Sequence, residues 1–66
     1  MSQSVVEYIH EVRIRKAKEL LIQTEKTVQE ISGSVGFANI QHFHRLFKRL
    51  TGVTPNEYRK TRREIF

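Results

Sequence analysis

Long polar side chains gather on one side of residues 41–49, and their types could recognise nucleic acid. Gln41, His42 and Arg45 come first, followed by a basic group of His44, Lys48 and Arg49. An arginine can donate two hydrogen bonds to the O6 and N7 atoms of guanine, and a glutamine can pair similarly with adenine. Since the first turns of such a helix usually reach base edges, we expect the first three to contact bases and the basic group phosphates.

Positive charge supports this hypothesis without deciding it. The net charge is +5, with 12 Lys and Arg against 7 acids. Most of the excess lies in residues 45–63, where Glu57 is the single acid. Such a field favours polyanions or anionic membrane surfaces. Residues 58–63 could be a phosphate clamp using Arg59 and Lys60, a membrane patch or a solubilising tail. The clamp is favoured, because the cations cluster beside the polar helix and the last helix lacks a continuous apolar face.

Metal binding and catalysis are poorly supported by the same residues. The histidines are His10, His42 and His44, and there is no cysteine. On a helix, residues 42 and 44 point about 200° apart, so they cannot share one ion. Glu7, Glu30 and Glu57 have capping spacing, and no carboxylate pair, nucleophile elbow or phosphate-binding glycine loop is present. We expect no enzyme, no cofactor and no metal.

The elements that must position these residues all have helical periodicity. Residues 4–23 predict a helix of about 30 Å, opened by the capping box of Ser4 and Glu7. Its outward side carries Arg13 and other cations. Apolar residues recur along it at threes and fours: Tyr8, Ile9, Val12, Ile14, Ala17, Leu20 and Leu21.

Residues 27–51 predict two further helices joined by a turn. Thr27 and Glu30 form a second capping box, and Gly36 supplies a left-handed stop. Gly33 lies inside the first of these helices, where glycine is unfavourable, so we expect close packing or fraying there. The inward face of the next helix is expected to be Ile40, Phe43, Leu46, Phe47 and Leu50.

Residues 54–64 predict a closing helix, with Thr54 and Glu57 as a third capping box and Pro55 at the first helical position. Tyr58 and Ile65 are expected to face the core. The chain is therefore predicted to be an all-α, helix-turn-helix, homeodomain-like bundle of about four helices with a long first helix. We expect one module over residues 1–66: a linker helix (4–23), a helix-turn-helix (27–51) and a closing helix (54–64). No segment is long and apolar enough for a membrane span.

Four spaced patterns extend together from about Tyr8 to Arg59. They are Arg13-Ile14-x-x-Ala17-x-x-Leu20-Leu21, Val28-x-x-Ile31-Ser32-x-x-x-Gly36-Phe37, Phe43-x-x-x-Phe47-Lys48 and Gly52-x-x-Pro55-x-x-Tyr58-Arg59. Through these patterns the chain resembles the AraC/XylS family of bacterial transcription regulators.

This resemblance implies duplex DNA as partner, and a parent protein with another helix-turn-helix unit and a sensory domain. The present chain would be the second unit with its joining helix, from a cytoplasmic, nucleoid-associated bacterial regulator. The family pattern implies that Asn39, Gln41, His42 and Arg45 face bases, with Lys48 and Arg49 nearer phosphates. Ile40 stands where the family often has a polar residue; it could touch a thymine methyl group or simply pack.

A protein-interaction module is the alternative. The exposed side of the first helix would then dock a missing domain or RNA polymerase, and apolar surface should remain there. A single DNA-binding unit makes few phosphate contacts, so we expect weak binding that depends strongly on salt.

Overall fold

The computed structural model describes residues 4–64. Over this range the chain forms four α-helices and no strand: α1 (Val5–Gln23), α2 (Val28–Ser34), α3 (Ile40–Thr51) and α4 (Pro55–Glu64). The predicted all-α fold with a long first helix is thereby confirmed. Ile65, expected in the core, lies outside the described residues.

Local side-chain hydrogen bonds define where the helices begin. In a capping box, a hydroxyl accepts from the backbone N–H three residues later, and the carboxylate there accepts from the backbone of the capping residue. This reciprocal pair forms at the start of α1, α2 and α4, between Ser4 and Glu7, Thr27 and Glu30, and Thr54 and Glu57. The sequence spacing therefore places three helix starts directly.

Two glycines end helices, but the third behaves differently from our expectation. Gly36 has φ 100° and Gly52 has φ 87°, both in the left-handed region. Gly33 lies within α2, and a Cβ built there would meet no atom within 4 Å. Of the two alternatives expected at Gly33, close packing is thus absent, because this side of the short helix faces open space; fraying stays a prediction.

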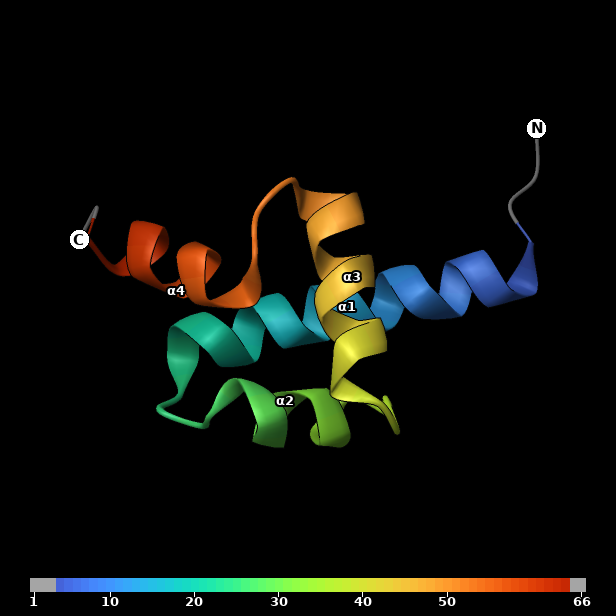
Figure 1. The fold of residues 1–66 in the computed structure, drawn as a ribbon, viewed down its shortest axis with the longest axis horizontal. Coiled ribbons are helices and arrows are strands. Elements are labelled where there is room, and N and C mark those ends of the chain that lie inside the picture. The colour runs from blue at the N-terminus through green and yellow to red at the C-terminus, as the bar shows by residue number, and fades with distance from the viewer. Residues whose placement is uncertain (1–3, 65–66) are drawn as a thin grey trace.

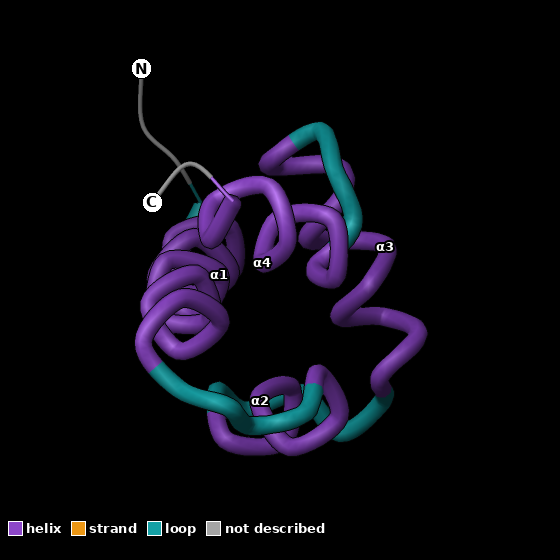
Figure 2. The backbone as a smooth tube through the Cα atoms, turned by 90° about the vertical axis from the view of Figure 1, so that its left-hand side faces the viewer, coloured by secondary structure: helices purple, strands orange, loops and turns teal. Residues whose placement is uncertain are grey.

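The helices surround a common apolar centre. Figure 1 shows α1 running along the long axis of the molecule, with α3 crossing it and α2 and α4 on opposite sides. Seen along α1, the four helices form a ring (Figure 2). Side chains from α1, α2, α3 and the connecting turn fill its centre: Ile14, Ala17, Leu21, Ile31, Val35, Phe37, Phe43, Leu46 and Phe47. Tyr58 of α4 packs against this core, as expected, with its ring 5.6 Å from that of Phe47.

Three residues lie elsewhere than the helical pattern predicted. Leu50, expected inside, is 42% exposed. Ile40, also expected inside, is half-buried and lies on the outward, polar side of α3. Arg13, expected in solvent, is half-buried and lies 5.9 Å from the centre of the Phe37 ring. A Cβ at Gly36 would lie 3.0 Å from Arg13 Nε. The absence of a side chain at Gly36 gives the arginine its place.

The apolar stripe of α1 divides into a covered half and an open half. Ile14, Ala17 and Leu21 are buried, whereas Val5 is 74% and Tyr8 59% exposed. The N-terminal half of α1 extends beyond the other helices (Figure 1). The apolar surface expected on this helix is therefore present. Between residues 4 and 64, no helix has the length and apolar content of a membrane span.

Candidate nucleic-acid interface

The start of α3 is fixed by Asn39 and its angle by the core. The Oδ1 atom of Asn39 accepts hydrogen bonds from the backbone N–H groups of Gln41 and His42, at 2.8 and 3.2 Å. Phe43 and Phe47 are fully buried beneath the helix. Because the side-chain carbonyl of Asn39 serves the cap, its amide nitrogen is left as the group that could reach a base.

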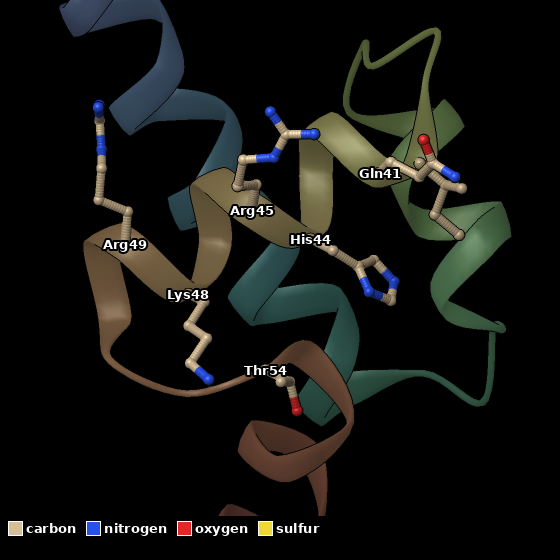
Figure 3. Close-up of a pocket in the computed structure, with 7 residues that line it drawn as sticks. Gln41, His44, Arg45, Lys48, Arg49 and Thr54 are labelled. Atoms are coloured by element: carbon tan, nitrogen blue, oxygen red, sulfur yellow. The ribbon is translucent and has the colours of Figure 1, made fainter.

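The outer face of α3 borders an open groove of about 780 Å³. Figure 3 shows its side chains projecting from the helix, with Thr54 at the edge. Its lining includes one amide, one imidazole and three cations, but no acid: Ile40, Gln41, His44, Arg45, Lys48, Arg49 and Thr54. We call this surface the outer groove.

Gln41 and Arg45 are both exposed and lie one helical turn apart on this groove. Side chains four residues apart share a helix face. Two groups able to make paired hydrogen bonds to successive bases are therefore presented together. Ile40, beside them, is half-buried and lines the same surface.

His42 points to a different place from the other expected base readers. Its ring lies 5.5 Å from Phe37 and 5.5 Å from His10, edge-on to both. It does not line the outer groove, but a smaller surface between α1 and α3 that includes Arg45. The structure thus separates His42 from Gln41. Helical geometry offered a signal for this, since consecutive residues lie about 100° apart.

The expected phosphate contacts on α3 divide into two kinds. Lys48 and Arg49 are exposed on the outer groove. His44 lines that groove too but is half-buried, and its ring packs edge-on to Phe43 at 6.2 Å. Its Nε2 atom is buried and has no hydrogen-bond partner in the described structure. His44 is therefore partly a packing residue, with less freedom to follow a phosphate.

The predicted clamp of residues 58–63 requires correction at Arg59. Its Nε donates to the carbonyl of Leu21 at 2.9 Å, and its Nη2 donates to the carbonyls of Thr24 and Lys26 at 3.2 and 2.6 Å. These acceptors lie at and just after the C-terminal end of α1. Because these hydrogen bonds occupy the guanidinium, Arg59 stabilises the fold and is not a free phosphate-binding group. Lys60, its neighbour, is exposed.

Acids near the outer groove are committed to capping. The pKa of Glu57 is lowered, first by the hydrogen bond from the Thr54 backbone N–H and only lastly by Lys48. The pKa of Glu7 is lowered in the same way by Ser4, with a smaller effect of Arg49. Both carboxylates stay ionised at neutral pH while their oxygens are turned toward the backbone.

The histidines come together in a pair that the sequence did not predict. His10 and His42 meet across α1 and α3, although neither residue type nor spacing marks them as neighbours. Among residues 4–64, no three histidine, cysteine or acidic side chains are grouped so as to hold a metal ion.

Comparison with known proteins places these observations in a family. The family model described as "Helix-turn-helix domain" matches residues 1–61. The chain is 47% identical, over 57 residues, to the bifunctional transcriptional activator/DNA repair enzyme AdaA of Bacillus subtilis (strain 168), covering 86% of this chain and 27% of AdaA. It is 34% identical to the xylose operon regulatory protein of Escherichia coli (strain K12), covering 98% of this chain and 17% of that protein.

A solved structure agrees in fold. The C-terminal domain of AraT, a response regulator from Geobacillus stearothermophilus, superposes with a TM-score of 0.87 at 39% identity, over 89% of this chain and 49% of that one. The chain thus spans about half of that solved domain and roughly a quarter or less of the two curated relatives.

Proposed function

The chain belongs to the AraC/XylS-type helix-turn-helix family of transcription regulators, and on this premise we propose that it binds duplex DNA sequence-specifically, with α3 in the major groove. The observation that carries the proposal is the outer groove, where Gln41 and Arg45 share one exposed face with Lys48 and Arg49 and no acid. A helix is about 10–12 Å across and the major groove about 12 Å wide. The outer face of α3 fits that space.

Five side chains of the outer groove have assigned roles in this proposal. Arg45 reads guanine and Gln41 reads adenine through paired hydrogen bonds. Ile40 lies where it can contact a thymine methyl group. Lys48 and Arg49 bind phosphates on either side of the groove, which positions the helix without reading sequence.

Three further residues have smaller roles. Lys60 on α4 and the half-buried His44 add weaker phosphate contacts, and the free amide of Asn39 reaches the first base. Since the relatives are transcription regulators, and the AdaA match covers 27% of that protein, we assign this chain no catalytic role and no cofactor. The bacterial cytoplasm, at the nucleoid, is the location that follows.

A second role, as an interaction module, is supported by the open half of α1. Val5, Val6, Tyr8, Ile9 and Val12 are exposed along one helix. Contiguous apolar surface of this kind is normally covered by a partner. We propose that another helix-turn-helix unit of a longer regulator packs there, with a sensory domain beyond it. RNA polymerase is the competing occupant.

The experiment that tests DNA reading compares Arg45→Ala with His42→Ala. Sequences bound by the chain are first selected from random duplexes, and affinities of the variants are measured at low ionic strength. Loss of one bidentate contact costs about 1–3 kcal/mol, so Arg45→Ala should weaken the selected site about 5- to 150-fold and relax preference at one position. His42→Ala, turned toward α1, should retain the preference.

Two results would contradict the proposal. If Arg45→Ala and Gln41→Ala keep wild-type affinity and preference, α3 does not read bases. If changes at Val12 or Ile9 abolish a partner contact while DNA binding by those α3 variants is unchanged, interaction is the real activity of the chain.

A further inference from the structure

A second groove lies between α1, α3 and α4, apart from the outer groove. It consists of two adjoining depressions of about 220 and 480 Å³, which share Lys18 and Leu50. The smaller depression runs along α1 past Arg15, and the larger extends to Tyr58 and Arg62 on α4. We call the two together the rear groove. None of the residues proposed to contact DNA lines it.

Three apolar side chains form the floor of the rear groove, beside two threonines. Leu50 is 42% exposed at its centre. Val53 and the Tyr58 ring, both half-buried, continue the floor toward α4. Leu50 and Tyr58 stand on helices, and the Tyr58 ring is supported from below by Phe47 at 5.6 Å. The floor is therefore preformed, and its side chains would lose little conformational entropy when a partner binds.

The rim of the rear groove is basic. Lys18 Nζ lies 6.0 Å, and Arg62 Cζ 5.1 Å, from the centre of the same Tyr58 ring. Arg15 is exposed on the α1 side. Glu11 is the one acid among the lining residues and lies at the end away from α4. Lys18 from α1 and Arg62 from α4 therefore both lie over the Tyr58 ring, while Arg15 lies further along α1.

The rear groove faces away from the outer groove. Leu50 follows Gln41 by nine residues, which at about 100° each places it half a turn round α3. The loop between α3 and α4 divides the two surfaces, with Thr54 on the outer groove and Val53 on the rear one. A molecule seated in the rear groove would leave Gln41 and Arg45 uncovered.

We infer that the rear groove docks an acidic amphipathic helix of a partner protein. Apolar side chains on one face of such a helix would cover Leu50, Val53 and the Tyr58 edge. Its flanking carboxylates would pair with Lys18, Arg62 and Arg15, where complementary charge favours encounter and correct orientation. DNA phosphates would pair with the cations of the rim but would not cover the apolar side chains of the floor. A wholly apolar partner would cover the floor but leave the cations without counter-charges.

The test is an NMR titration of the isotope-labelled chain with a synthetic helical peptide that has leucines along one face and glutamates flanking them. Backbone signals of residues 15–18, 50–53 and 58–62 should shift, while those of Gln41 and Arg45 stay in place. A matched peptide with lysines replacing the glutamates should bind at least tenfold more weakly. Absence of binding by the acidic peptide, or shifts centred on the outer groove, would overturn the inference.

Variants then separate a docking site from a general effect of charge. Leu50→Ser and Arg62→Gln should each weaken binding of the acidic peptide severalfold. Arg45→Ala removes the same positive charge as Arg62→Gln, but from the outer groove, and should leave peptide binding unchanged. Circular dichroism verifies the fold; because Arg62 is exposed, its variant provides the test even if Leu50→Ser unfolds. Equal losses in Arg45→Ala and Arg62→Gln would overturn the inference. The inference would also be overturned if duplex DNA shifted the NMR signals of residues 50–53 and 58–62 as the peptide does, because the rear groove would then bind nucleic acid.

Discussion

Arg59 shows how a single side chain can join the two ends of this fold. The last turn of α1 contains no basic residue of its own. Positive charge near the C-terminal end of a helix is favourable, because the final carbonyls carry partial negative charge and lack helical partners. Arg59 provides that charge from α4, and its three hydrogen bonds tie α4 to α1 and to the following loop.

Replacing Arg59 should therefore destabilise the fold without altering the outer groove. Hydrogen bonds to a charged group contribute about 1.5–3 kcal/mol, so we expect Arg59→Met to lower the free energy of unfolding by about 2–3 kcal/mol, measured by urea denaturation. Lys60→Met, at an exposed neighbouring position, is the matched control and should change it little. Equal unfolding midpoints for the two variants would show that Arg59 is not structural.

At the scale of the helix, α2 is the shortest of the four described helices and offers a site for stabilisation. It has 7 residues, and one of them is Gly33. Helices this short depend on capping and tertiary contacts, because they form too few helical hydrogen bonds to offset the unfavourable free energy of nucleation. Thr27 and Glu30 cap its start, while Ile31 is fully buried against the core. The other buried residue, Ser32, donates its hydroxyl to the Gln29 carbonyl at 3.1 Å, so its burial leaves no polar group unpaired.

Gly33→Ala should stabilise the domain. A Cβ at this position meets nothing within 4 Å, and alanine is favoured over glycine in a helix interior by about 0.8–1 kcal/mol. We expect thermal unfolding to shift upward by a few degrees. Gly36→Ala is the opposing control, because φ is 100° there and the new Cβ would press on Arg13. A gain in stability from Gly36→Ala, or a loss from Gly33→Ala, would contradict this account of the turn.

The capping carboxylates make helix stability depend on pH. The pKa of Glu30 lies below its ordinary 4.5, chiefly because its carboxylate accepts a hydrogen bond from the Thr27 backbone N–H. Glu7 and Glu57 are lowered by the same kind of bond. Since each pKa is lower in the folded state, their stabilisation is complete above pH 4.5 and is lost as pH falls through the lowered values.

Urea midpoints measured as a function of pH should therefore decline on the acid side. Glu30→Gln should reduce that decline, because one of the ionisations coupled to folding is removed. Glu19→Gln is the control, since Glu19 makes an exposed ion pair with Lys16 and caps no helix. If the urea midpoint of Glu30→Gln declined with falling pH as steeply as that of the parent chain, the coupling between Glu30 ionisation and folding would be refuted.

At the scale of the whole molecule, the chain presents its outer groove, its rear groove and the open half of α1 on separate surfaces. The molecule measures 37 × 25 × 17 Å, and α1 runs along its longest axis (Figure 1). In the proposed function, DNA, a partner protein and another domain of the regulator could be bound together. One recognition helix makes few phosphate contacts, which limits affinity.

Binding by this chain alone should be weak and should fall steeply with salt. We expect a dissociation constant in the high micromolar range at physiological salt, near that of non-specific complexes, and a negative slope of log affinity against log salt. Lys48→Ala and Arg49→Ala should each make that slope shallower by about 1. Arg59→Met, provided it remains folded, should leave the slope unchanged. Tight binding that is insensitive to salt would contradict the proposal.

The sequence alone determined the helices and their ends. Capping boxes, glycine stops and apolar periodicity act between residues three or four apart, so their outcome is present in the local chain. The all-α fold and the exposed faces of Gln41 and Arg45 could both be predicted in this way. Agreement with the AraC/XylS family rests on the same local spacings.

Only the tertiary structure decided which side chains meet across helices. Arg59 bonds to carbonyls 33 to 38 residues earlier, and His42 turns to His10 on α1. Arg13 occupies the space left by Gly36, and Leu50 lies in the rear groove between α1, α3 and α4. A helical pattern gives the direction of a side chain around its own axis. What lies in that direction depends on how the helices cross, which is set by packing of the whole core.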